Sequence, residues 1–205
     1  MAASDAQDVP VSGVRLVIAA GVALILVLVG AMLLTTDRGL FKDYAAAPLG
    51  GDFTLTSADG PVSLSDFRGQ VVLLYFGFLN CPEVCPTSMG IYRQTLKRLD
   101  ADELSQVQPL LVTIDPARDD PDALDEFGTY YHPSIIGLGG SDADIRAVAD
   151  QYGAYFKAVP DDGEVEYVFE HTSRYYVIDQ SGTLVAAMRH STTANELLAR
   201  VRSLL

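Results

Sequence analysis

The sequence predicts an α/β fold built on a central mixed sheet, and three observations lead to this prediction. Through the middle of the chain, apolar strand-like runs alternate with segments of helical periodicity, which is typical of parallel strands joined by helices. Near the C-terminus two strand-like runs flank a turn at residues 179–182, which indicates an antiparallel hairpin, and a last helix follows. The chain has 205 residues, 49% of them hydrophobic, which is enough for one domain with a substantial core.

The first predicted elements surround a strand-to-helix junction. A short strand-like run at residues 53–56 and a turn at 59–61 precede residues 71–79, which are apolar, β-branched and aromatic enough for a strand buried on both faces. The next segment is helical, because Tyr92, Leu96 and Leu99 recur at i, i+4 and i+7 with basic residues between them. Pro86 fits the first turn of this helix, where its missing N–H costs nothing.

The later elements follow the same reasoning. A second buried strand is predicted at residues 109–114, ending at Asp115, and Asp120 and Pro121 then supply an N-cap and a first-turn proline for a helix. In chain order, the remaining predictions are a short strand at 135–138, a helix carrying Ile145, Val148, Ala149 and Tyr152, a strand or arm at 165–169, a strand at 174–178, its hairpin partner at 183–188, and a closing helix carrying Leu197, Val201 and Leu204.

The N-terminal region differs in kind. Residues 16–34 are 19 consecutive residues without a charge, and as a helix they would measure roughly 28 Å, close to the thickness of a bilayer core. The run ends in a poor cleavage site, so a removed signal peptide is disfavoured. We therefore predict a tail at 1–15, a single transmembrane helix at 16–34, a linker at 35–50 and one domain at 51–205.

The flanking charges orient this anchor only weakly. A short tail inside and a large domain outside is the commoner arrangement for a single-span protein. We therefore expect a single-pass protein of the cell (inner or plasma) membrane, with its soluble domain on the extracytoplasmic or periplasmic side. A pair of cysteines can become oxidised in that compartment.

The charge balance argues against nucleic acid as a partner. The chain has 27 acidic and 14 basic residues and a net charge of −13. It contains no basic run and no glycine-rich phosphate loop, whereas binding to phosphates requires clusters of Lys and Arg.

Both cysteines of the protein lie at the predicted strand-to-helix junction. The N–H groups and dipole of a helix N-terminus favour the thiolates of Cys81 and Cys85. Three residues separate them, so on one helical turn both sulfur atoms can point to the same spot. This spacing can close a disulfide or hold one metal ion. Thiolates select Cu(I), with Zn(II) as the usual competitor, and an added imidazole also suits Cu(II).

Several motifs resemble known families. Residues 52–55, residues 64–69 and the strand that runs into a cysteine loop resemble the thioredoxin-like superfamily. More narrowly, the chain is similar to the Sco/SenC family over about residues 50–205, through Tyr75-Phe76-Gly77-Phe78, Cys81-Pro82-Glu83-Val84-Cys85-Pro86, Thr113-Ile114-Asp115-Pro116-Ala117-Arg118-Asp119 and Glu170-His171-Thr172. Two departures, Glu83 where Asp is usual and Asn80 where an aromatic residue or His is frequent, remove no ligand but alter the surroundings of the site.

The resemblance implies a membrane-anchored copper-binding protein that assists assembly of the copper centre of cytochrome c oxidase. It implies one copper ion per chain, held by the thiolates of Cys81 and Cys85 and the imidazole of His171, and a partner that is the copper-bearing subunit of the oxidase or another copper chaperone. His171 lies just before the predicted hairpin strand, where thioredoxins place a proline against their cysteines. This chain has Thr172 and no proline there, so a ligand on that loop can face the cysteines.

Other polar residues have ordinary structural interpretations. We expect His132 and His190 to be surface or core residues, Met89 to pack in the core, and Asp115 to be a turn or capping carboxylate. A further group is expected to consist of helix-start acids on a solvated face: Asp119, Asp120, Asp122, Asp125 and Glu126.

Three alternatives to a copper metallochaperone remain. One is a thiol–disulfide oxidoreductase that reduces the cysteines of a partner before metal is inserted; a classical enzyme is otherwise not expected. A second is a purely structural disulfide between Cys81 and Cys85. A peroxidase of the peroxiredoxin type is disfavoured, because the Arg and Thr arrangement needed around its cysteine is not found in the sequence.

Overall fold

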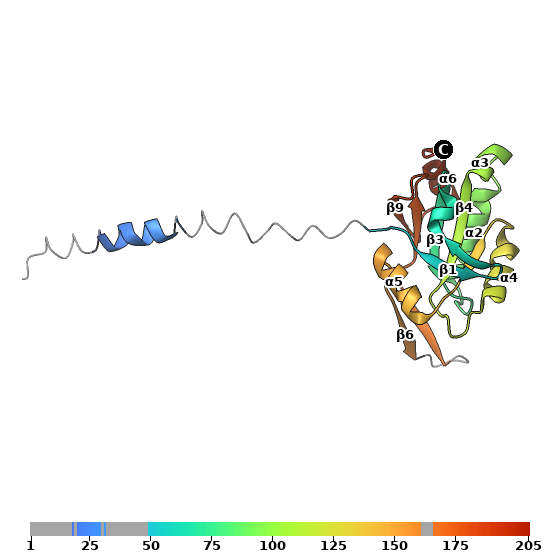
Figure 1. Cartoon of the computed structure of the whole chain (residues 1–205), viewed down its shortest axis with the longest axis horizontal. Coiled ribbons are helices and arrows are strands. Elements are labelled where there is room, and N and C mark those ends of the chain that lie inside the picture. The colour runs from blue at the N-terminus through green and yellow to red at the C-terminus, as the bar shows by residue number, and fades with distance from the viewer. Residues whose placement is uncertain (1–17, 19, 30, 32–48, 161–165) are drawn as a thin grey trace, which may run out of the picture. The chain divides into compact units, whose positions relative to one another are not determined.

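The computed structural model describes residues 18, 20–29, 31, 49–160 and 166–205 (Figure 1). The chain divides into two units, residues 1–48 and residues 49–205. In the first unit, the described residues between 18 and 31 are helical. Within the described part of the chain, no helix combines the length and the apolar character that crossing a membrane requires. The predicted tail, most of the predicted linker and part of the predicted anchor at 16–34 lie outside the described residues.

The second unit is built on a five-stranded mixed sheet, as predicted, with the strand order β5-β4-β3-β8-β9. Its central strand β3 (Val71–Gly77) is buried along its whole length. It pairs in parallel with β4 (Val107–Thr113), which pairs in parallel with β5 (Ile136–Leu138). On its other side β3 pairs antiparallel with β8 (Arg174–Ile178), which forms a hairpin with β9 (Leu184–Arg189).

Helices cover both faces of this sheet (Figure 1). Successive side chains of a strand point to opposite faces. The ring of Tyr75 in β3 packs against Tyr92 of α2 (Val84–Leu96), with ring centroids 6.4 Å apart. The next residue, Phe76, packs against Tyr152 of α5 (Asp142–Tyr152), with centroids 6.3 Å apart. The helices α2 and α5 therefore lie on opposite faces of β3.

Three further helices complete the unit. The helices α4 (Pro121–Tyr131) and α6 (Ala194–Arg202) both contact α2, and a short helix, α3 (Ala101–Ser105), precedes β4. The N-cap carboxylate of Asp120 accepts a hydrogen bond from the N–H of Ala123, which confirms the helix start predicted at Asp120 and Pro121. Helix α3 was not predicted from the sequence.

Two small antiparallel sheets flank the central one. The first joins β1 (Thr54–Ser57) to β2 (Gly60–Ser63), and the 3-10 helix η1 (Leu64–Phe67) follows. The second is the β6–β7 hairpin, which pairs β6 (Phe156–Pro160) with β7 (Tyr167–His171). The strand or arm predicted at 165–169 corresponds to β7. The sequence did not indicate β6, because only one of its five residues is buried and no alternating pattern results.

We predict that a shortened protein comprising residues 49–205 folds by itself. It has 157 residues (205 − 48), enough for one domain. It also keeps the hydrogen bonds from the Gly50 N–H to the Gln151 carbonyl and from the Tyr152 hydroxyl to the Gly51 carbonyl. A version that begins at Asp52 loses both, so its free energy of unfolding in urea should be lower by about 1–3 kcal/mol. Aggregation of the 49–205 protein that residues 1–48 relieve would contradict this prediction.

Candidate metal site

The two cysteines lie at the N-terminus of α2, as predicted, and the sulfur of Cys81 acts as the missing cap of that helix. The N-cap residue Glu83 makes no side-chain capping hydrogen bond, whereas the caps of α4, α5 and α6 all do. Instead, the backbone N–H of Cys85 donates a hydrogen bond to Sγ of Cys81, at 3.3 Å. The loop after β3 is thereby folded back over the first turn of α2, with the Cys81 sulfur held by one N–H of the helix.

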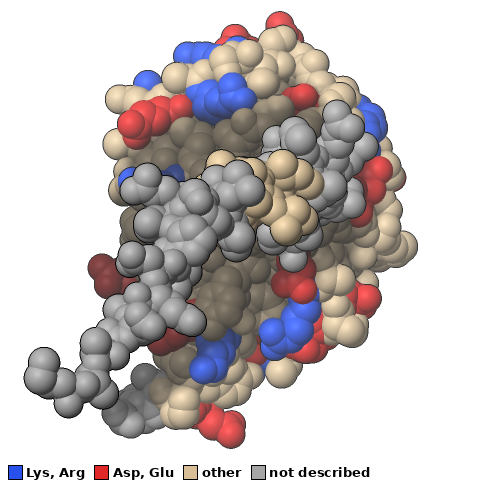
Figure 2. All heavy atoms as spheres, turned by 90° about the vertical axis from the view of Figure 1, so that its left-hand side faces the viewer, with Lys and Arg blue, Asp and Glu red and all other residues tan. Residues whose placement is uncertain are grey.

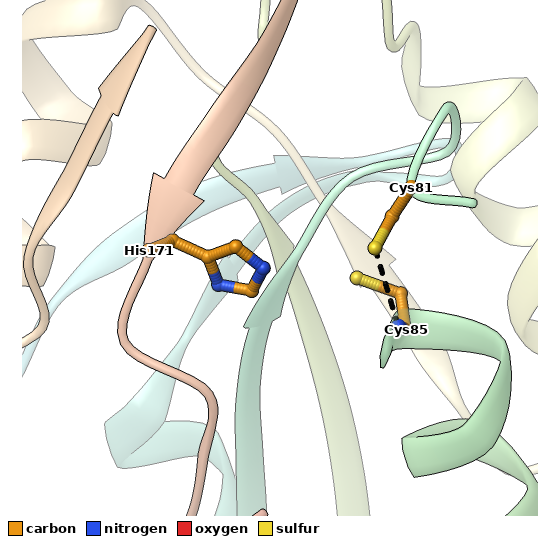
Figure 3. A group of neighbouring side chains, drawn as sticks. All are labelled: Cys81, Cys85 and His171. Carbon is orange, nitrogen blue, oxygen red and sulfur yellow. Dashed lines mark hydrogen bonds between the residues drawn. The ribbon is translucent and has the colours of Figure 1, made fainter. Parts of the chain in front are cut away.

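Three potential metal ligands meet at this point. Sγ of Cys81, Sγ of Cys85 and a ring nitrogen of His171 all lie within 4.8 Å of one another, and the imidazole points toward the two sulfurs (Figure 3). Both cysteines are free thiols, with exposed fractions of 7% and 0%, and His171 is partly buried. Nδ1 of His171 lies 3.3 Å from the carbonyl oxygen of Thr172. A hydrogen bond there leaves Nε2 as the free nitrogen lone pair.

The two thiols have opposite acidities. A hydrogen bond from the thiol of Cys85 lowers the pKa of Cys81 well below its usual value; burial opposes this shift, and the neighbouring His171 side chain and the Cys85 backbone N–H add to it. That same hydrogen bond to Cys81, together with burial, raises the pKa of Cys85. Of the two thiols, Cys81 is therefore the one that loses its proton more readily.

A glycine in β3 makes room for Cys85. A Cβ atom placed on Gly77 would lie 2.9 Å from Sγ of Cys85 and 3.1 Å from a ring carbon of Tyr75. Any larger residue would push the sulfur away from its present position. The sequence predicts no role for Gly77. A glycine within a strand nevertheless often marks a site where another group comes close to the backbone.

A pocket of about 400 Å³ opens beside the three ligands. It is lined by Phe78, Cys81, Pro82, Glu83, Val84, Val168, Phe169, His171 and Ser173. The ring of Phe78 packs edge-on against the imidazole of His171, with centroids 5.8 Å apart, and against Phe169, with centroids 5.3 Å apart. Cys81 lines the pocket and Cys85 does not, so a molecule that enters the pocket meets Cys81 first.

The loop between β4 and α4 corrects one prediction. Asp119, expected on a solvated face, is only 3% exposed. Its Oδ2 accepts hydrogen bonds from the Thr113 hydroxyl at 2.7 Å and from the Leu79 N–H at 3.1 Å. Burial raises the pKa of this carboxyl. The prediction was wrong because a run of acids before a helix gives no sign that one of them turns inward to bind a loop 40 residues away.

The other polar residues have structural roles. Asp120, Asp122 and Glu126 are exposed, as predicted, and Asp125 is half-buried. Asp115, 1% exposed, is one partner of an ion pair with Arg118 and accepts a hydrogen bond from the Tyr167 hydroxyl at 2.8 Å. In the described ranges it joins no group of metal ligands.

The remaining histidines and Met89 also lie outside the group of ligands. Nδ1 of His132 shares a hydrogen bond with the Ser134 hydroxyl, at 2.8 Å, and Nδ1 of His190 lies 3.4 Å from the Ser88 hydroxyl. Met89 is fully buried in the core, which confirms its predicted packing role.

Comparison with known proteins identifies the family. A family model described as SCO1/SenC matches residues 42–205. The chain belongs to the SCO1/SenC family. It is 34% identical over 163 residues to the mitochondrial protein SCO2 of Saccharomyces cerevisiae, which covers 78% of this chain and 54% of that one. It is also 34% identical over 154 residues to the SCO2 homolog of Mus musculus, covering 74% and 60%. The chain thus spans little more than half the length of these mitochondrial relatives.

Solved Sco structures share the fold. Apo Sco1 from Thermus thermophilus superposes with a TM-score of 0.71 at 34% identity, covering 78% of this chain and 93% of that one. ScoI from Bradyrhizobium japonicum with copper bound superposes with a TM-score of 0.69 at 30% identity, covering 77% and 99%. The central mixed sheet is therefore the thioredoxin-like sheet of Sco proteins, as predicted.

The close approach at Gly77 yields a test. We predict that Gly77→Ala lowers the free energy of unfolding by about 1–3 kcal/mol, because its methyl group overpacks the contact with Cys85. Gly90→Ala is the matched control. Gly90 lies within α2 and nothing stands within 4 Å of a Cβ placed there, so this change should stabilise the protein by about 0.5–1 kcal/mol. Urea denaturation measures both; equal stabilities of the two variants would contradict the packing argument.

Proposed function

We propose that this Sco protein binds one copper ion between Cys81, Cys85 and His171. The observation that carries the proposal is the meeting of two buried thiols and one partly buried imidazole within 4.8 Å at a helix start. Two thiolates suit Cu(I), and the imidazole extends the set to Cu(II). Support comes from solved relatives that are described with copper bound: ScoI of Bradyrhizobium japonicum and Sco1 of yeast, the latter 29% identical with a TM-score of 0.68.

We further propose that the copper is cargo, delivered to the copper centre of cytochrome c oxidase or used in its assembly. A relative 27% identical to this chain, BsSco, is described as a member of the Sco family of cytochrome c oxidase assembly proteins. The expected partner is the copper-bearing subunit of the oxidase or another copper chaperone. On the face drawn in Figure 2, the described Lys and Arg side chains lie among Asp and Glu side chains rather than in one basic area.

The location proposed for the protein rests on its sequence. The uncharged run at 16–34 supports a single-pass anchor in the cell membrane. The close spacing of Cys81 and Cys85, which allows a disulfide to form, suits an extracytoplasmic domain, where a cysteine pair can become oxidised.

Each of the three ligands has a different role in binding the copper. Cys81 lines the pocket and carries the lowered pKa, so its thiolate is the first ligand that an incoming ion meets. Cys85 must then give up its proton to become the second thiolate, so loading releases a proton. His171 supplies Nε2 from the opposite wall, with Phe78 packed against its ring.

A second candidate function is thiol–disulfide exchange with a partner. It is favoured by the asymmetry of the pair: Cys81 lines the pocket and has a lowered pKa, whereas Cys85 lies behind it and has a raised pKa. The Cys81 thiolate would attack a partner's disulfide and release one partner thiolate. The Cys85 sulfur would then attack Cys81, releasing the second partner thiol and leaving the Cys81–Cys85 disulfide. This would reduce the partner by two electrons and oxidise this protein by two.

We predict that copper binding depends on the redox state of the pair. Reduced protein should bind about one equivalent of copper, and protein oxidised to the Cys81–Cys85 disulfide should bind almost none, because a cysteine binds the metal as a thiolate and not as a disulfide. Metal analysis after gel filtration measures both states. Equal copper retention in the reduced and the oxidised protein would exclude the two-thiolate site.

A substitution of His171 distinguishes copper binding from thiol–disulfide exchange. We predict that His171→Ala weakens Cu(II) binding by more than about 100-fold, because losing a ligand should cost more than the 10–100-fold typical of an outer partner. The variant should still fold and still form and reduce the Cys81–Cys85 disulfide, since exchange needs no remote imidazole. Cys81→Ala and Cys85→Ala should lose both copper binding and disulfide formation. The measurements are the thiolate-to-copper charge-transfer absorption and a thiol titration.

His132→Ala and His190→Ala are the matched controls, because neither residue belongs to the group of ligands in the described chain. Both should bind copper as the unchanged protein does. A His171→Ala variant with unchanged copper stoichiometry and spectrum would instead favour thiol–disulfide exchange.

A further inference from the structure

We propose that Arg118 is a positioning residue for His171, and that the loop from Asp115 to Asp119 braces the two halves of the metal site against each other. This inference rests on the proposed copper site and adds to it the residues that set the distance between the cysteines and the imidazole. The loop follows β4 and touches both the cysteine loop and the β6–β7 hairpin, two segments about 90 residues apart in the sequence.

On the hairpin side, the loop binds Tyr167, the first residue of β7, in three ways. The guanidinium of Arg118 lies over the Tyr167 ring, 3.7 Å from its centroid. Nη1 of Arg118 also donates a hydrogen bond to the Tyr167 carbonyl oxygen, at 3.0 Å. The Tyr167 hydroxyl in turn donates to Oδ1 of Asp115, and Asp115 pairs with Arg118 through its other oxygen. Ring, carbonyl and hydroxyl of one residue are thus all fixed by one ion pair.

On the cysteine side, the same loop holds the residue where the cysteine loop begins. Oδ2 of Asp119 accepts the hydrogen bond from the Leu79 N–H, two residues before Cys81. The carboxylate is itself fixed by the Thr113 hydroxyl at the end of β4. Arg118 and Asp119 are neighbours in the chain, so the hairpin and the cysteine loop are tied to adjacent residues.

The hairpin requires such a brace because β6 and β7 pair only with each other in the described structure. An isolated two-stranded hairpin is only marginally stable. Tyr167, Phe169 and His171 are spaced by two along β7 and share one face, and Phe169 packs against both Tyr167 and Phe78. Arg118 holds the first of these three residues, so it limits where the last, His171, can lie.

The test compares variants of the full-length protein by Cu(II) titration, followed through the charge-transfer absorption. Arg118→Gln should weaken Cu(II) binding by about 10–100-fold, the range typical of residues that orient a ligand. Tyr167→Leu should do the same while leaving the Arg118–Asp115 pair intact, which covers the case in which Arg118→Gln folds poorly. The amount of Cu(I) bound by the reduced protein should not change, and the disulfide should still form, because both cysteines keep their places. Arg202→Gln, which breaks an exposed pair with Glu103, is the control and should bind Cu(II) normally.

A double variant decides whether Arg118 acts through His171. Adding Arg118→Gln to His171→Ala should cause no further loss of Cu(II) affinity, because the residue being positioned is already absent. A further loss equal to that of Arg118→Gln alone would overturn the proposal.

A copper-free measurement separates the brace from the copper site. Amide hydrogen exchange in β7 should be faster in Arg118→Gln and Tyr167→Leu than in the unchanged protein, with exchange in α6 unaltered. Unchanged exchange in β7 together with unchanged Cu(II) affinity would overturn the brace. If His171→Ala binds Cu(II) normally, the copper site is wrong, and the exchange rates in β7 still decide whether Arg118 holds the hairpin.

Discussion

The site depends on the contact between the first turn of α2 and the sulfur of Cys81. A helix start leaves N–H groups without partners, and here a sulfur atom accepts one of them in place of a capping side chain. This contact folds the loop after β3 so that both sulfurs lie together, and it favours the charged form of Cys81. Gly77 is the complementary constraint, since only a residue without a side chain lets Cys85 come so close to β3.

Much of the fold was predictable because its signals are local. The buried central strand, the N-cap at Asp120 and the C-terminal hairpin are each specified by residues within one short stretch of sequence. The ligands were predictable for a different reason. Two cysteines one helical turn apart carry a chemical signal of their own, and His171 was found through the family resemblance rather than through its spacing.

What escaped the sequence analysis consists of contacts between distant segments. Asp119 reaches Leu79 across 40 residues and Tyr167 reaches Asp115 across 52, and no periodicity records either contact. An acidic residue before a helix is usually solvated, so Asp119 was wrongly expected on a solvated face, although its side chain is buried. Strand β6 was missed because it lies at the edge, with its side chains mostly in solvent.

The separate sheet formed by β6 and β7 has a consequence for the energetics of the molecule. Since no backbone ladder joins it to the central sheet in the described structure, detaching it breaks side-chain contacts, among them those of Phe156 with the core, and leaves the central sheet paired. Local opening of this unit therefore costs less free energy than global unfolding. The cysteines lie beside the central sheet, and the histidine lies on the hairpin that can open separately. The number of ligands offered to a metal is thus coupled to a sub-global folding equilibrium.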